Sequence, residues 1–121
     1  MLTAFLWMLV AVLLHEAGHA LAALLLGLRI KGVTFRLWGV GIVREQGPPV
    51  DSLIVSAAGP LINVACAALA GDASTFAVAN WCVGLVNLLP ISGSDGSHIL
   101  ACLHKIENLR IRRRCLEEYT R

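Results

Sequence analysis

The sequence is poor in charge. Ten Lys and Arg and eight Asp and Glu amount to 15% of its 121 residues, against about 25% in soluble domains, whereas 57% of the residues are hydrophobic. It also lacks cysteine pairs at C-x-x-C spacing, which argues against a cysteine-based zinc site and a disulfide framework. No internal repeat, low-complexity linker or nucleic-acid-binding motif interrupts it. These absences exclude an ordinary soluble domain and predict one membrane-embedded unit over residues 1–121.

Three stretches with almost no charge are long enough to cross about 30 Å of hydrocarbon. They comprise residues 2–28, 52–71 and 73–94. No Lys or Arg precedes the first stretch, and its apolar run exceeds the core of a signal peptide, so we expect it to be retained. The predicted fold class is an all-α membrane protein with three transmembrane helices.

The basic residues are confined to two segments, four between the first two spans and six after the third. With three crossings these segments share one side, which the positive-inside rule assigns to the cytoplasm. The N-terminus and the turn Gly71-Asp72-Ala73 are then outside. We therefore expect an integral, multi-pass membrane protein. Its basic tail is expected to meet anionic lipid headgroups and no nucleic acid.

The first span contains the pentapeptide His15-Glu16-Ala17-Gly18-His19. A charged residue at membrane depth costs about 3 kcal/mol on insertion scales, so a functional role is the default hypothesis. H-E-x-x-H places two imidazoles on one helix face with a carboxylate beside them, which is typical of zinc hydrolases. The alternative is a polar face that pairs with another helix or lines an ion path.

A third metal ligand is needed, because two histidines leave a catalytic zinc site one protein ligand short. Residues 87–96, NLLPISGSDG, combine helix breakers with an acid at the end of the third span. Asp95 is the best candidate for this ligand. The alternative for Asp95 is an N-cap of the following helix.

The second span contains Ala57-Ala58-Gly59-Pro60-Leu61-Ile62-Asn63. Small residues let helices approach closely in lipid, so this face is expected to pack on the first helix near Gly18 and Ala22. Pro60 can bend the span. Asn63 is a candidate for an interhelical hydrogen bond or, alternatively, for a substrate contact.

Residues 30–43 alternate in polarity and predict a short β-hairpin at the cytoplasmic surface, with Gly39-Val40-Gly41 turning the chain. The hairpin is either a connector or an edge to which an extended substrate adds a strand. In the segment 95–118, apolar residues recur at helical spacing among basic ones. They predict a basic amphipathic helix on the inner leaflet, or a solvated or partner-binding tail.

The motifs HEAGH, AAGPLIN and NLLPISGSDG, in this order, resemble the site-2 protease family of intramembrane zinc metalloproteases over residues 2–100. The resemblance implies one Zn²⁺ held by His15, His19 and Asp95, with Glu16 as general base. It implies that Asn87 stabilises an oxyanion or positions the substrate.

The chain departs from the family pattern around the acid, with Gly93-Ser94 before Asp95 and Ser97 after Gly96. Its length suggests a minimal core, near the branch of the sporulation-factor protease and so in a bacterial cell membrane. The predicted function is zinc-dependent hydrolysis of a peptide bond in or near a transmembrane segment. Alternatives are an inactive relative that binds membrane proteins and an ion or proton conduit. Expected partners are a transmembrane substrate, the bilayer, and a second copy or a regulatory membrane protein.

Overall fold

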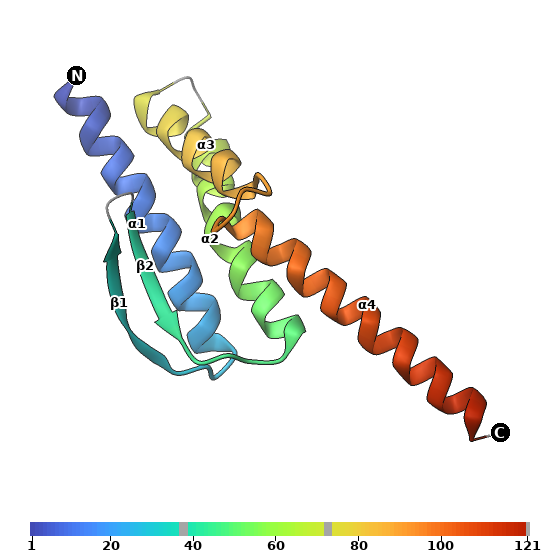
Figure 1. Cartoon of the computed structure of the whole chain (residues 1–121). Coiled ribbons are helices and arrows are strands. Elements are labelled where there is room, and N and C mark those ends of the chain that lie inside the picture. The colour runs from blue at the N-terminus through green and yellow to red at the C-terminus, as the bar shows by residue number, and fades with distance from the viewer. Residues whose placement is uncertain (37–38, 72–73, 121) are drawn as a thin grey trace.

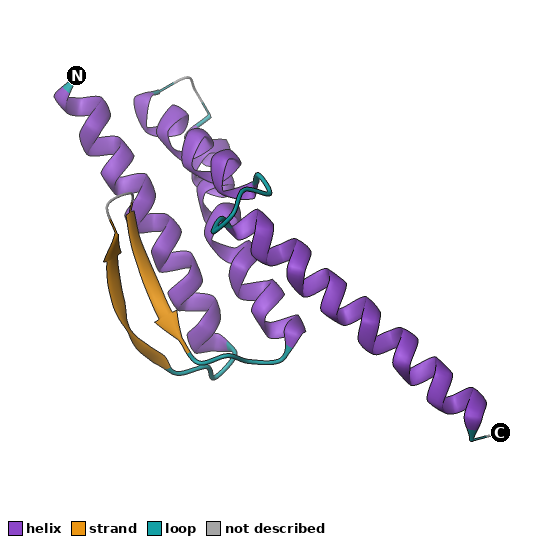
Figure 2. Cartoon of the chain, viewed as in Figure 1, coloured by secondary structure: helices purple, strands orange, loops and turns teal. Residues whose placement is uncertain are grey.

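The computed structural model describes residues 1–36, 39–71 and 74–120. Four helices and one antiparallel hairpin make up this part of the chain (Figures 1 and 2). Their bounds are α1 Leu2–Leu25, β1 Ile30–Arg36, β2 Gly39–Arg44, α2 Pro49–Ala70, α3 Thr75–Leu88 and α4 Asp95–Tyr119.

Two helices, α1 and α2, are long and apolar enough to cross a membrane. Helix α3 has 14 residues and extends about 21 Å, which is less than the hydrocarbon thickness. The predicted third span, 73–94, is therefore helical only over 75–88. Leu89 is extended because it precedes Pro90, whose ring disfavours helical backbone at the residue before it. Three complete crossings stay a prediction.

Large apolar side chains on α1 are mostly exposed in the isolated chain. A soluble domain would bury such a face, whereas a helix in lipid presents it to the acyl chains. The exposed residues are Leu2, Phe5, Leu6, Trp7, Met8, Leu9, Leu13, Leu21, Leu24 and Leu25.

Helices α1, α2 and α3 pack side by side around a small core that contains Ala11, Ala79 and Val83. Helices α1 and α2 approach closely at Gly18, where an added Cβ would lie 2.8 Å from the backbone oxygen of Ala58. The predicted packing of the small residues of the second span near Gly18 is confirmed.

The predicted hairpin is present, but its predicted turn was wrong. Gly39 and Gly41 belong to β2 and pair with Arg36 and Thr34, so they do not form the turn. Residues 37–38, which connect the strands, and residues 72–73 of the predicted outer turn lie outside the described residues. The hairpin does not extend beyond the helix ends. It folds back along the C-terminal half of α1, with β2 nearer to that helix (Figure 1).

Helix α4 confirms the predicted C-terminal helix, but its predicted amphipathic character was wrong. Ile99, Leu103 and Ile106 share one face of the helix. Further towards the C-terminus the same face carries the charged residues Arg110 and Glu117, so it is not apolar along its length. The far half of α4 runs away from the three packed helices (Figure 1).

We expect Gly18→Ala to lower the unfolding midpoint of the protein in detergent, measured by circular dichroism. The new methyl group meets a backbone oxygen that cannot move alone, and overpacking of this kind costs about 1–3 kcal/mol. Gly32→Ala is the matched control, because an added Cβ there has nothing within 4 Å. Equal midpoints for the two variants would contradict the close α1–α2 contact.

Candidate metal centre

Three polar side chains converge where α1, α2 and the start of α4 meet. His15 and His19 lie one turn apart on α1, and Asp95 is the first residue of α4. Asp95 Oδ2 lies 2.8 Å from His15 Nε2 and 3.2 Å from His19 Nε2, and the two Nε2 atoms are 3.1 Å apart. The three residues proposed as ligands from the sequence are thus brought together around one point.

The other nitrogen of each imidazole has a fixed partner on α2. His15 Nδ1 donates to Asn63 Oδ1 at 2.7 Å, and His19 Nδ1 donates to the Val55 carbonyl oxygen at 2.7 Å. A carbonyl oxygen only accepts, so these contacts require a proton on each Nδ1. In the neutral tautomers both Nε2 lone pairs then face Asp95, as in histidines that bind metal.

This donor set fits zinc. Tetrahedral coordination with Zn–N and Zn–O distances of about 2.0–2.2 Å places ligand atoms about 3.3 Å apart. The three measured separations, 2.8 to 3.2 Å, need only a slight expansion to admit the ion. Two imidazoles and one carboxylate are also a known catalytic ligand set, which keeps the fourth position open for water.

Asp95 is free to act as a ligand because a neighbour caps its helix. The Ser94 hydroxyl accepts from the Ser97 N–H at 3.3 Å, so Ser94, and not Asp95, is the N-cap. The Asp95 carboxyl takes no part in capping, and its Oδ2 atom faces the Nε2 atoms of His15 and His19.

Gly59 makes room for both imidazoles. An added Cβ at this position would lie 2.5 Å from His19 Cε1 and Nε2 and 3.0 Å from His15 Cε1. The role of Gly59, expected from the sequence to be helix packing, thus includes shaping the face of α2 that receives the two rings.

A buried amide relay holds His15 in place. Asn63 Nδ2 donates to the Ala11 carbonyl at 2.8 Å and to Asn80 Oδ1 at 2.9 Å, and Asn80 Nδ2 donates to the Phe76 carbonyl at 3.0 Å. Both asparagine side chains are completely buried. Asn63 therefore forms the interhelical hydrogen bonds predicted as one of its two roles, joining α1, α2 and α3.

Asn80 was missed by sequence reasoning. An uncharged amide within the apolar third stretch was the available signal, but nothing in the sequence paired Asn80 with Asn63. The pairing depends on how α2 and α3 are aligned, which only the fold reveals.

Glu16 and Asn87 flank the cluster differently. Glu16 is half-buried on α1, with the backbone of Ile42 in β2 beside its carboxylate. Asn87 Nδ2 donates to the Val83 carbonyl of its own helix at 2.9 Å. Its role towards a substrate stays a prediction.

The sequence profile of the Peptidase M50B-like family matches residues 3–103 of the chain, which include every residue of the cluster. The chain belongs to the Peptidase M50B-like family. Comparison with curated proteins gives no match.

A solved structure that resembles this Peptidase M50B-like chain is the site-2 protease from Methanocaldococcus jannaschii. The two structures superpose with a TM-score of 0.70 at 28% identity, over 84% of this chain and 54% of that one. The chain thus spans about half the length of that protein. The predicted resemblance to the membrane-embedded site-2 protease family is confirmed, whereas its assignment to a branch stays a prediction.

We expect Asn63→Ala to weaken zinc binding by about 10- to 100-fold, because partners that orient a metal-binding histidine typically have effects of this size. Affinity is measured by competition with a chromogenic chelator on the protein in detergent. Asn87→Ala is the control and should leave affinity unchanged, since its amide bonds only within α3. If Asn63→Ala bound zinc like the wild type, the relay would have no part in orienting His15.

Proposed function

We propose that this chain is an intramembrane zinc endopeptidase that hydrolyses a peptide bond in or near a transmembrane segment of a membrane protein. The observation that carries the proposal is the convergence of His15 Nε2, His19 Nε2 and Asp95 Oδ2 next to Glu16. Membership of a peptidase family gives this cluster its chemical context.

The residues divide the proposed reaction between them. When bound, zinc supplies Lewis-acid chemistry, since it polarises the peptide carbonyl and makes water acidic enough to deprotonate near neutral pH. His15, His19 and Asp95 hold the ion. Glu16 accepts the proton of the attacking water and passes it to the amine that leaves. Asn87 positions the substrate or stabilises the developing oxyanion, as the family resemblance implies.

A helical substrate must unwind before it can be cut, because its carbonyl groups are bonded within the helix. We propose that β2 captures the unwound segment. One edge of β2 pairs with β1, and the backbone of Ile42 lies beside Glu16. A strand added along β2 on the side of α1 would bring its backbone next to the general base.

The position in the membrane and the partners are part of the same proposal. The charge distribution supports a cytoplasmic C-terminus and an outer N-terminus. A bacterial cell membrane rests on the family resemblance alone. The two candidate spans and the shorter apolar helix α3 leave much surface exposed to lipid around the cluster, which favours a second copy or a regulatory membrane partner.

Neither alternative function accounts for the cluster equally well. An inactive relative has no need of Glu16 beside three converging donors. An ion conduit does not require that both Nδ1 atoms be fixed by α2.

The central prediction concerns metal content. The wild-type chain of 121 residues purified in detergent should contain about one zinc per chain by atomic emission, as expected for a single site with three protein ligands. His15→Ala and Asp95→Ala should each lose it. His104→Ala is the matched control and should retain zinc, because His104 is exposed on α4 outside the cluster. Wild-type protein without zinc would overturn the proposed function.

The same preparations separate metal binding from chemistry. Glu16→Gln should keep its zinc and cleave a single-span reporter about 10²–10⁴ times more slowly, because it lacks only the proton-accepting group. Cleavage by Glu16→Gln at the wild-type rate would exclude Glu16 as the base. Zinc binding with no Glu16-dependent cleavage would favour the inactive relative.

Capture by β2 has its own test. We expect deletion of residues 36–43 to abolish reporter cleavage while zinc content is retained. Ile42→Pro should also slow cleavage, since it removes one backbone donor beside Glu16. Ile42→Ala, which keeps that donor, is the control. Unchanged cleavage after the deletion would show that the hairpin is only a connector.

A further inference from the structure

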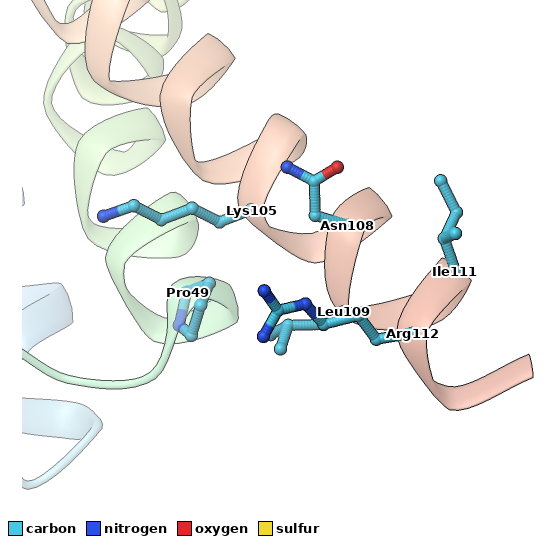
Figure 3. A pocket seen from close by; sticks show the side chains of 6 residues that line it. All are labelled: Pro49, Lys105, Asn108, Leu109, Ile111 and Arg112. Atoms are coloured by element: carbon cyan, nitrogen blue, oxygen red, sulfur yellow. The ribbon is translucent and has the colours of Figure 1, made fainter. Parts of the chain in front are cut away.

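A cavity of about 500 Å³ lies between the beginning of α2 and the middle of α4, away from the candidate metal centre (Figure 3). It is lined by Pro49, Lys105, Asn108, Leu109, Ile111 and Arg112. No residue of the cavity takes part in the proposed hydrolysis.

One face of α4 forms most of the lining. Lys105, Asn108, Leu109 and Arg112 follow one another at intervals i, i+3, i+4 and i+7, so they share one side of the helix. Figure 3 shows the Lys105 side chain reaching over α2 and the Arg112 guanidinium turned towards Pro49. The two basic side chains of α4 thus lie beside the N-terminal end of α2.

The cavity is at the level expected for lipid headgroups. Pro49 is the first residue of α2, one of the two helices apolar and long enough to span the membrane. The end of such a helix marks the boundary between hydrocarbon and water. The N-terminus of α2 also carries partial positive charge, and Pro48 supplies no side-chain cap to its first amides.

The charges of the cavity are not neutralised within the described chain. In residues 1–36, 39–71 and 74–120, the close contacts of acidic side chains with histidine or basic ones join Asp95 to His15 and His19, and none involves Lys105 or Arg112. Asp51 lies in the first turn of α2 and forms no ion pair with Lys105 or Arg112 among the described residues. Glu107 is on the other side of α4, because it is two residues from Lys105.

We propose that this cavity binds the phosphate headgroup of an anionic phospholipid. Lys105 and Arg112 contact the phosphodiester, and Leu109 and Ile111 pack against the glycerol and upper acyl chains. Long basic side chains can reach a headgroup while their stems stay on apolar surface, and basic pockets beside membrane helices favour anionic headgroups. The lipid would hold the near half of α4 against α2 at the membrane surface.

The test is native mass spectrometry of the 121-residue chain in detergent, titrated separately with phosphatidylglycerol and phosphatidylcholine of identical acyl chains. Wild-type protein should bind phosphatidylglycerol more tightly. Lys105→Gln/Arg112→Gln should lose about 30-fold in that affinity, as expected for two basic contacts, and should bind phosphatidylcholine unchanged.

Arg110→Gln/Arg114→Gln is the matched control. It removes the same charge from the same helix, on the face opposite the cavity, and should keep the wild-type preference. Equal losses in both double variants would show diffuse charge attraction and overturn the site. The proposed site would also be overturned if the wild type showed no preference for phosphatidylglycerol, or if Lys105→Gln/Arg112→Gln kept the wild-type preference.

Two further variants check the interpretation. Arg112→Lys should keep most of the preference, because it retains a cation at the cavity; complete loss in this variant would contradict a phosphate contact based on charge. His15→Ala should bind phosphatidylglycerol like the wild type. This variant therefore tests the lipid site independently of the metal centre.

Discussion

The structure depends on how α2 fixes the two imidazoles of α1. The Nδ1–H of His15 is buried and that of His19 is partly buried, and a buried donor without a partner costs about 1–3 kcal/mol. Val55 and Asn63 supply the two acceptors, so α1 and α2 must stay in one register. The close contact at Gly18 and the absence of a side chain at Gly59 follow from this constraint, because the rings occupy the space between the helices. The same bonds direct both Nε2 atoms to one point.

The short third helix explains how Asp95 reaches that point. Phe76 of α3 contacts Trp7 of α1 edge to face, with ring centroids 5.2 Å apart, so the two residues are at the same level. Helices α1 and α3 run in the same direction, and twelve residues later Leu88 ends α3 at about the level of His19. The loop 89–94 therefore begins beside the imidazoles. A third helix that spanned the whole membrane would carry Asp95 past them.

The sequence was sufficient for features that depend on local spacing. The His15 and His19 pair, the hairpin and the C-terminal helix were predicted because residue spacing and periodicity along the chain determine them. Asp95 was predicted from the chemistry of an incomplete ligand set. Features that depend on the alignment between helices could not be predicted from the sequence. Asn80 has no local signature, and its bond to Asn63 arises only when α2 and α3 pack. The hairpin was predicted at the surface because its sequence shows strand alternation but not the direction in which the strands fold back.

The position of the hairpin and the early end of α3 have one common consequence. Non-helical backbone at membrane depth is tolerated only where protein or water satisfies its polar groups. Here β2 lies along α1 beside Glu16, and the loop 89–94 leads into Asp95, so both irregular segments border the same cluster. The hydrolysis proposed for that cluster would require water, and water also satisfies the free edge of a strand and the carbonyls of a loop. A hydrated cavity around the imidazoles would therefore serve both the chemistry and the stability of the backbone that surrounds it.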